Sequence, residues 1–271
     1  MISINKIHES HFHNLKQEGY TIVRGYHDHS KDLDILSELM DISFNRQTLL
    51  RKQLNHDMKS DGVAFHVLAE NPQYLNFFEI LVKKGLFQDL KENFFKANCI
   101  LNSFTALNNV PNEPNFSSII HRDLRFYSGE FPVMVNCLLM VDDFTIENGA
   151  TYLLPESHLL EDKPTDEYFY KNAIQATGKR GDLIIFDSNV FHASAPNKTD
   201  QNRRALPITI SRSFMKQLLD YPRAITTELG MSMYSFSKEV QQALGYHSRV
   251  PSNLIEWYNP EETRLYLKNQ D

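Results

Sequence analysis

The chain has little of what characterises several large protein classes. It has only two cysteines in 271 residues, Cys99 and Cys137, which excludes a disulfide scaffold. Both lie in apolar, strand-like stretches, where we expect buried thiols in a reducing cytoplasm. No apolar run approaches the roughly 20 residues that a membrane-spanning helix needs, and the first residues lack the apolar segment of a signal peptide. These absences predict a cytoplasmic protein with no membrane partner.

Clustered positive charge is also missing. The chain has 28 Lys and Arg against 34 Asp and Glu, which gives a formal net charge of −6. Its longest basic runs are pairs such as Lys83-Lys84 and Arg203-Arg204. Because nucleic-acid phosphates require clustered Lys and Arg, we expect no nucleic-acid partner. A small-molecule substrate is the partner we expect, and the sequence carries no signal for an oligomeric state.

The chain also lacks a linker. No stretch rich in Pro, Gly and Ser divides it, and 41% of its residues are hydrophobic, enough for one sizeable core. We therefore predict a single domain over residues 1–271. Residues 1–96 are predicted to be mainly helical support, with a strand at 20–24 and helices at 31–55, 72–84 and 86–96, where apolar residues recur at helical spacing.

The middle of the chain consists of short β-rich segments. They are separated by turn residues, and they cover residues 97–106, 117–122, 132–141, 150–154, 172–177, 182–186 and 204–211. Many short strands without intervening helices favour a barrel or jelly roll over a parallel α/β sheet. We predict a mainly β fold with flanking helices: a core at 97–213, then a helical and irregular segment at 214–271, with helices at 214–219 and 237–244.

One tripeptide and one distant histidine suggest a metal site. In a strand, residues i and i+2 face the same side, so His121 and Asp123 are predicted to point together into the barrel. The tripeptide alone would equally suit a solvated strand end. His192, which follows an apolar strand and a polar break, offers a second imidazole. Two histidines and one carboxylate form a facial triad, which leaves coordination positions of iron open for an oxygenase reaction.

Arg203 completes the pattern eleven residues after His192. If the segments around 192 and 204 pair as a hairpin, Arg203 lies near the metal but deeper in the barrel. Its guanidinium then suits the distal carboxylate of a diacid whose keto-acid end chelates iron. Ser194 shares the side of His192 and is predicted to add a hydroxyl. Arg204 is the competing candidate, although strand alternation directs it the opposite way.

Together these motifs resemble the phytanoyl-CoA dioxygenase family of Fe(II)/2-oxoglutarate oxygenases. The resemblance is carried by His121-Arg122-Asp123, Asn148-Gly149-Ala150-Thr151, Leu154-Pro155-Glu156-Ser157-His158, and His192-Ala193-Ser194 followed by Arg203. It implies a double-stranded β-helix, a cupin-like jelly roll. It also implies His121, Asp123 and His192 as Fe(II) ligands, Arg203 and Ser194 as anchors of 2-oxoglutarate, and O2 as the second cosubstrate.

The chain departs from the family at one strand. Many relatives carry a Trp on the strand after the Asp ligand, and here that strand reads Val135-Asn136-Cys137-Leu138-Leu139-Met140-Val141. Asn136 or Asn102 is a candidate for a polar contact to the cosubstrate instead, with an ordinary strand role as the alternative. Arg125 continues the His121 side and is predicted to contact the substrate, or to be a solvated rim arginine.

The expected reaction is hydroxylation of an unactivated C–H bond in a small metabolite or natural-product intermediate, with release of succinate and CO2. Asp123 fills the position that related halogenases leave small, so hydroxylation is predicted ahead of halogenation. Desaturation or cyclisation at the same iron is an alternative outcome. A metal-binding jelly roll without turnover is an alternative from another class, and a zinc hydrolase leaves Arg203 unexplained.

Overall fold

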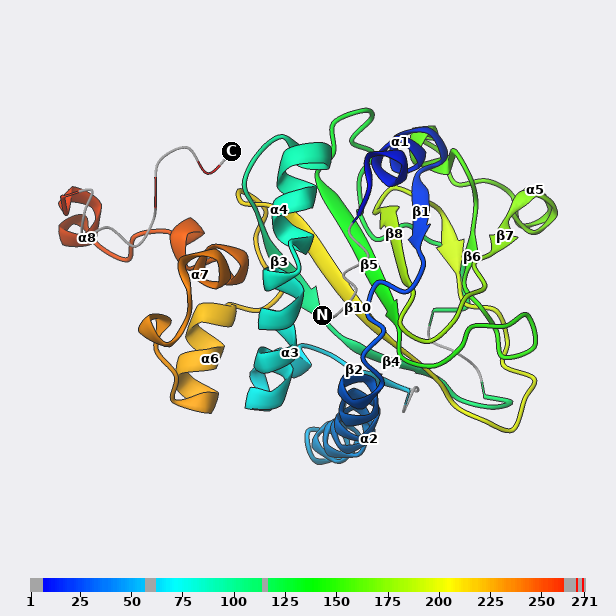
Figure 1. Ribbon diagram of the computed structural model, residues 1–271, viewed down its shortest axis with the longest axis horizontal. Helices are drawn as coiled ribbons and strands as arrows, with labels where there is room; N and C mark the ends of the chain where they lie inside the picture. The colour runs from blue at the N-terminus through cyan, green and yellow to red at the C-terminus, as the bar shows by residue number, and fades with distance from the viewer. Residues whose placement is uncertain (1–6, 57–61, 114–116, 261–266, 268–269, 271) are drawn as a thin grey trace.

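Two antiparallel sheets form the centre of the computed structural model, which describes residues 7–56, 62–113, 117–260, 267 and 270 (Figure 1). The strands of the large sheet follow the order β1 (Tyr20–Val23), β8 (Leu183–Asp187), β5 (Met134–Met140), β10 (Arg203–Arg212), β4 (Ala106–Asn109), β2 (Val63–Ala64). A seventh strand, β3 (Cys99–Phe104), also pairs with β10. The small sheet runs β7 (Ile174–Gln175), β6 (Tyr152–Leu153), β9 (His192–Ala193).

Helices cover one face of the large sheet. A continuous apolar core joins that face to α2 (Ser30–Gln53), α3 (Pro72–Lys83), α4 (Leu86–Leu90), α6 (Tyr221–Leu229) and α7 (Lys238–Leu244). The remaining helices are α1 (Glu9–Glu18) beside β1, α5 (Asp166–Asn172) near the small sheet, and α8 (Leu254–Tyr258) at the far end of Figure 1. Single helical turns lie at Val67–Ala69, Lys91–Phe95, Ser157–Leu159, Met233–Ser235 and Tyr246–Ser248. The predicted β core with flanking helices is confirmed, but 39% of the structure is helical, so "mainly β" overstates the sheet.

Strand alternation gives the large sheet two different faces. Along β5, Val135, Cys137 and Leu139 belong to the core shared with the helices, whereas Leu138 and Met140 pack toward the small sheet. A period of two in the sequence therefore directs every second residue to the interior of the jelly roll. The metal-site candidates lie on that inner side.

A proline divides what the sequence presents as one strand at 97–106. Residues Ile208–Arg212 of β10 pair with β3, and Arg203–Ala205 pair with β4. Pro207 lies between these two pairings and has no N–H to donate, so the ladder is interrupted there and only its carbonyl accepts, from the Thr105 N–H at 3.0 Å. The interruption creates the separate strands β3 and β4.

Two predicted elements are wrong. Residues 117–122 form no strand; in the described part of this segment, only the isolated bridge between His121 and His192 is regular pairing. Residues 214–219 form turns instead of a helix, and the next helix begins at Tyr221. In both segments contacts with distant parts of the chain override local periodicity. The helix predicted at 86–96 is confirmed, as α4 continued by a π-helical turn at Lys91–Phe95.

Two further predictions concern the cysteines and the membrane-spanning helices. Cys99 and Cys137 are both buried and both free. Within the described ranges, no helix combines the length and the apolar character needed to cross a bilayer.

Candidate metal centre

His121 and His192 come from distant segments and are joined by their backbones. The N–H of each residue donates to the carbonyl of the other, at 3.1 Å from His121 and 2.9 Å from His192. This bridge brings the two imidazole ring centroids to 4.3 Å. The Phe186 ring packs edge-on against His192 at 4.9 Å and limits the rotation of that ligand.

Asp123 reaches the same place by a loop, not by strand alternation. The N–H groups of Asp123 and Leu124 both donate to the carbonyl of Ser188, at 3.1 and 3.0 Å. The carboxylate oxygens then lie 3.6 Å from His121 Nε2 and 3.6 Å from His192 Nε2. The candidate ligand atoms of the three residues all lie within 4.8 Å of one another. The structure therefore brings the triad together, although the reason predicted for its geometry was wrong.

Arg122, between two triad residues, points away from them. Its guanidinium lies 4.3 Å from the centroid of the Phe191 ring and donates to the carbonyls of Leu160 and Glu161. These contacts hold the loop that carries His121 and Asp123 against the segment after the helical turn at Ser157–Leu159. The triad side chains are left facing the interior.

The backbone fixes which nitrogen each histidine offers. Nδ1 of His121 donates to the Ile119 carbonyl at 2.7 Å, and Nδ1 of His192 donates to the Val190 carbonyl at 3.0 Å. A carbonyl can only accept, so each Nδ1 carries the proton. The lone pair of a neutral ring is therefore on Nε2, the atom nearest Asp123.

Charge in the triad suits a divalent cation. Burial alone would raise the pKa of Asp123, but His192, His121 and Asn136 together lower it, so the carboxylate is ionised. Burial lowers the pKa of His192, which keeps that imidazole neutral. For His121 burial is outweighed by Asp123 and the Ile119 carbonyl, which raise its pKa. Two imidazole nitrogens and one carboxylate are the donor set that non-haem Fe(II) oxygenases use.

Asn136, a predicted cosubstrate contact, instead orients Asp123. Its amide nitrogen donates to Asp123 Oδ2 at 2.8 Å and to Ser188 Oγ at 2.9 Å. Its amide oxygen accepts from Thr209 Oγ1 at 2.8 Å, and Thr209 accepts from Ser103 Oγ at 3.0 Å. The amide is therefore locked with its donor side toward the carboxylate. The predicted contact with 2-oxoglutarate has no support in this arrangement.

Arg203 is the most unusual charged side chain of the inner face. It is fully buried, and Nε, Nη1 and Nη2 have no hydrogen-bond partner among the described residues. Its guanidinium lies 4.2 Å from the Phe144 ring centroid. Burial lowers its pKa to about 9, an effect that the charge of Asp142 partly offsets. Because an unpaired buried cation is strongly unfavourable, the site fits an anionic group that completes it.

Arg204, the competing candidate, is fully engaged elsewhere. It donates to both carboxylate oxygens of Asp41, at 2.9 and 2.8 Å, and to Asp142 at 3.2 Å. The side chain points to the helical face, as strand alternation predicts. The hairpin predicted between 192 and 204 is wrong, because β9 pairs with β6 in the small sheet and β10 pairs with β5, β3 and β4. Arg203 and His192 are instead connected through one inner cluster that includes Phe144 and Phe186.

The other predicted contacts lie in different surroundings. Ser194 is buried and its hydroxyl lies 2.8 Å from that of Ser117. Asn102 is buried and donates to the Lys216 carbonyl at 3.0 Å, so it supports the turn after β10. Arg125 is exposed, in the loop that follows Asp123.

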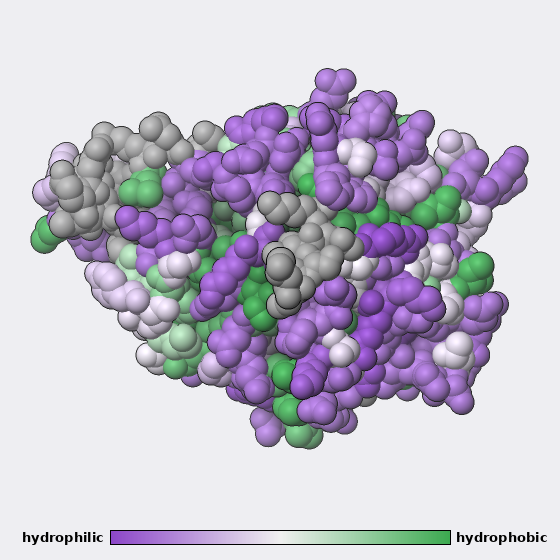
Figure 2. Space-filling view, in the orientation of Figure 1, coloured by the Kyte–Doolittle hydropathy of each residue, from purple (hydrophilic) through white to green (hydrophobic). Residues whose placement is uncertain are grey.

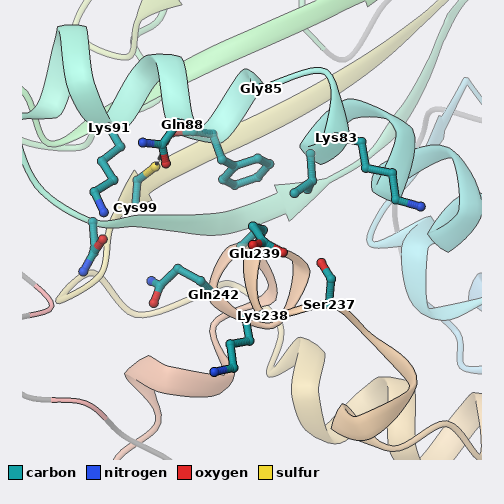
Figure 3. Close-up of a pocket in the computed structure, with 13 residues that line it drawn as sticks. Lys83, Gly85, Gln88, Lys91, Cys99, Ser237, Lys238, Glu239 and Gln242 are labelled. Carbon is teal, nitrogen blue, oxygen red and sulfur yellow. Dashed lines mark hydrogen bonds between the residues drawn. The ribbon is translucent and has the colours of Figure 1, made fainter.

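A separate groove lies on the helical side of the molecule. It has a volume of about 690 Å³ between α4 and α7, and Figure 3 shows Lys91, Gln88, Glu239 and Gln242 around it. None of its lining residues belongs to the triad or to the inner face beside Arg203. It is therefore not the metal centre.

Sequence reasoning missed the supporting residues of the site. Ser188, Thr209 and Phe186 had no motif to single them out, and the carbonyls of Ile119 and Val190 are present at every residue type. Only the polar break after the apolar strand 182–186 gave a signal, because Ser188 lies in it. Such contacts depend on the backbone path rather than on residue identity.

Comparisons with known proteins agree with this geometry. Residues 15–205 match the phytanoyl-CoA dioxygenase (PhyH) family. The uncharacterized protein Rv1501 of Mycobacterium tuberculosis is 32% identical over 206 residues, 76% of this chain and 71% of that protein. Dioxygenase sphC of Aspergillus fumigatus is 30% identical over 159 residues, 56% of this chain and 42% of that protein.

Solved structures show the same fold. The non-heme alpha-ketoglutarate-dependent epimerase SnoN from nogalamycin biosynthesis superposes with a TM-score of 0.55 at 18% identity, over 75% of this chain and 80% of SnoN. AviO1 from Streptomyces viridochromogenes gives a TM-score of 0.54 at 17% identity, over 74% of this chain and 93% of AviO1. With a family match over most of its length and an inner face built for a metal and an anion, the chain belongs to the phytanoyl-CoA dioxygenase family and is a 2-oxoglutarate-dependent dioxygenase.

Proposed function

We propose that this oxygenase hydroxylates an unactivated C–H bond of a small metabolite or natural-product intermediate. The observation that carries the proposal is the combination of an ionised Asp123 between two imidazole donors with a buried Arg203 that has no hydrogen-bond partner among the described residues, on the same inner face. A bare metal-binding protein has no need of that arginine. A zinc hydrolase would leave it equally unexplained.

Each residue has a distinct part in this proposal. His121, Asp123 and His192 hold Fe(II) through Nε2, a carboxylate oxygen and Nε2. Arg203 binds the 5-carboxylate of 2-oxoglutarate through charge-assisted hydrogen bonds, and Ser194 remains a proposed neighbour of that carboxylate. When bound, Fe(II) with 2-oxoglutarate and O2 supplies the oxidising power for the C–H bond and yields succinate and CO2. The protein contributes position and the exclusion of water.

Along two strands, some inner-face residues keep slightly more exposure than residues nearer Arg203. Along β5, the inward residues Met134, Asn136 and Leu138 keep 4–7% exposure, whereas inward Met140 is fully buried. On β10 inward Thr209 is 8% exposed and inward Ala205 is fully buried. We propose that the substrate enters from the Met134 end of β5 and that the cosubstrate carboxylate occupies the closed end, where Arg203 lies.

Hydroxylation is proposed ahead of other outcomes because Asp123 occupies the ligand position that a halide would need. The fungal relatives sphC, FUM3 and cdmA carry the name dioxygenase, and SnoN is named an epimerase on the same fold. Desaturation and cyclisation therefore stay as alternative products of the same site. Arg125 at the rim is a proposed contact for a polar or anionic substrate.

Succinate formation tests the proposal. Purified protein with Fe(II), ascorbate and 2-oxoglutarate should form succinate slowly by itself and faster with a substrate found by screening metabolite pools. A product 16 mass units heavier with ordinary O2, and 18 units heavier with 18O2, supports hydroxylation; loss of two mass units identifies desaturation or cyclisation instead. Absence of succinate under all conditions would identify a metal-binding protein without turnover.

A further inference from the structure

The outer surface of α2 carries an apolar stripe that nothing in the described structure covers. Ile35, Ile42 and Leu49 are 45%, 61% and 61% exposed, and they follow one another at intervals of seven residues. Seven residues turn a helix to within about 20° of the same direction, so the three side chains form one line. Apolar side chains show as green at the lower edge of Figure 2, where Figure 1 draws α2.

The opposite side of α2 already supplies its share of the core. Leu33, Leu36, Leu39, Met40 and Phe44 are buried against the sheet and the neighbouring helices. A helix that packs by one face only would have polar residues along the other. Three apolar residues at intervals of seven on the outer face form one of the two apolar rows by which a helix packs against a second helix.

Charge is divided along the same helix. The half from Ser30 to Asp41 has four carboxylates and one lysine, and the half from Ile42 to Gln53 has three basic residues and no acidic one. Two antiparallel copies of α2 would therefore place each acidic half beside the basic half of the other copy. Parallel copies would place like charges together.

The register of such a pair follows from the stripe. With Ile42 on a two-fold axis, Ile35 of one copy meets Leu49 of the other, because each lies seven residues from the centre. Glu38 of one copy then lies at the same level along the helix as Arg46 of the other, since each lies four residues from the axis. Neither Glu38 nor Arg46 has an ion-pair partner elsewhere in the described part of the chain, whereas Asp34 and Asp41 are bound by Arg180 and Arg204. A two-fold interface is self-complementary in this way.

We propose that the protein forms a homodimer through antiparallel packing of α2 on α2, with Ile42 at the two-fold axis. The partner is a second copy of this chain, because the complementary charges and the apolar line occur on one helix. This interface is on the helical side of the large sheet and leaves the triad unobstructed. The proposal does not depend on the reaction that the site performs.

Mass measurement across a concentration series tests the proposal. Light scattering after size-exclusion chromatography should give twice the chain mass of 31.5 kDa for the native protein. Ile42→Lys places two ammonium groups at the axis and should return the mass to that of one chain. Ile146→Lys is the matched control, because Ile146 is 62% exposed and lies in a turn outside α2, and it should remain dimeric. A native protein that is monomeric at all concentrations overturns the proposal.

Charge exchange tests the register. Glu38→Arg should weaken the dimer by about tenfold at low salt, because it puts a second positive charge at the level of Arg46 of the other copy. Adding Arg46→Glu to the same chain should restore native affinity; a double variant as weak as the single one overturns the antiparallel register. In addition, Ile42→Cys should crosslink with a short bis-maleimide while Ile146→Cys does not, and the native thiols are buried. Unchanged circular dichroism in each variant separates dissociation from unfolding.

Discussion

The two faces of the large sheet use the same strands for opposite purposes. On the helical face, Val135, Cys137 and Leu139 are fully buried in the main apolar core. On the inner face, Asn136 and Thr209 form a hydrogen-bonded chain to Asp123 and keep a little exposure. The helical face of the sheet stabilises the fold by apolar burial, and the inner face carries polar groups in a fixed arrangement.

Arg203 and Arg204 show the difference within two adjacent residues. Arg204 points to the helices and is bound by two carboxylates, while Arg203 points inward, is fully buried and has no hydrogen-bond partner among the described residues. A buried guanidinium without a hydrogen-bond partner is unfavourable unless a ligand compensates for its charge. Substitutions on the two faces should therefore separate stability from binding.

The largest effect is expected from Asp123→Ala. Removing the carboxylate should weaken Fe(II) or Co(II) binding by more than about 100-fold and reduce succinate formation to background, because removing a ligand costs more than removing a residue that supports one. Calorimetric titration with Co(II) measures the affinity directly. Asp143→Ala removes an exposed carboxylate that pairs with Lys179, and it should leave that affinity unchanged. Native-like metal binding by Asp123→Ala would eliminate the triad.

Leu139→Ala should affect stability alone. Leu139 is fully buried on the helical face, so truncation leaves a cavity and should lower the free energy of unfolding by about 3 kcal/mol. The Michaelis constant for 2-oxoglutarate should be unchanged. Urea unfolding and succinate assays on the same preparation measure both quantities, and a raised Michaelis constant would show that the faces are coupled.

Arg203→Met should weaken the binding of 2-oxoglutarate without lowering the stability of the fold. Loss of a charge-assisted bidentate contact should raise the Michaelis constant for 2-oxoglutarate by about 100-fold. The free energy of unfolding without ligand should stay the same or rise, because an unpaired buried cation is removed. Arg204→Met is the control: it loses its ion pairs to Asp41 and Asp142, about 1 kcal/mol of stability, with no change in cosubstrate dependence. A raised Michaelis constant for 2-oxoglutarate in Arg204→Met but not in Arg203→Met would identify Arg204 as the residue that binds the cosubstrate.

The smallest of these effects is expected from Asn136→Leu. The side chain keeps its volume but leaves Asp123 Oδ2 and Ser188 Oγ without their donor, so Co(II) affinity should fall by about 10-fold. Thr209→Val, one hydrogen bond further from the carboxylate, should have a weaker effect in the same direction. Equal metal affinity for the native protein and Asn136→Leu would reduce Asn136 to an ordinary strand residue.

Local patterns predicted the regular elements well where the repeating pattern of apolar residues extended over many residues. The helices at 31–55 and 72–84 and the strands at 132–141, 182–186 and 204–211 correspond to α2, α3, β5, β8 and β10. Two-residue strands such as β2 and β9 were missed, because they are defined by their partners and have no period of their own. Residues 117–122 were taken for a strand because they are β-rich, but they bind distant backbone groups without forming a ladder.

The sequence by itself determined the ligand types, their order and the inward direction of Arg203, because residue identity and strand alternation are local properties. Tertiary structure decided the rest. His121 meets His192 across a backbone bridge, and the Ser188 carbonyl positions Asp123. Arg203 has no hydrogen-bond partner among the described residues, although its neighbour Arg204 is bound by two carboxylates. These are contacts between segments far apart in the chain. Their distances depend on how the two sheets and the helices pack, which no local pattern specifies.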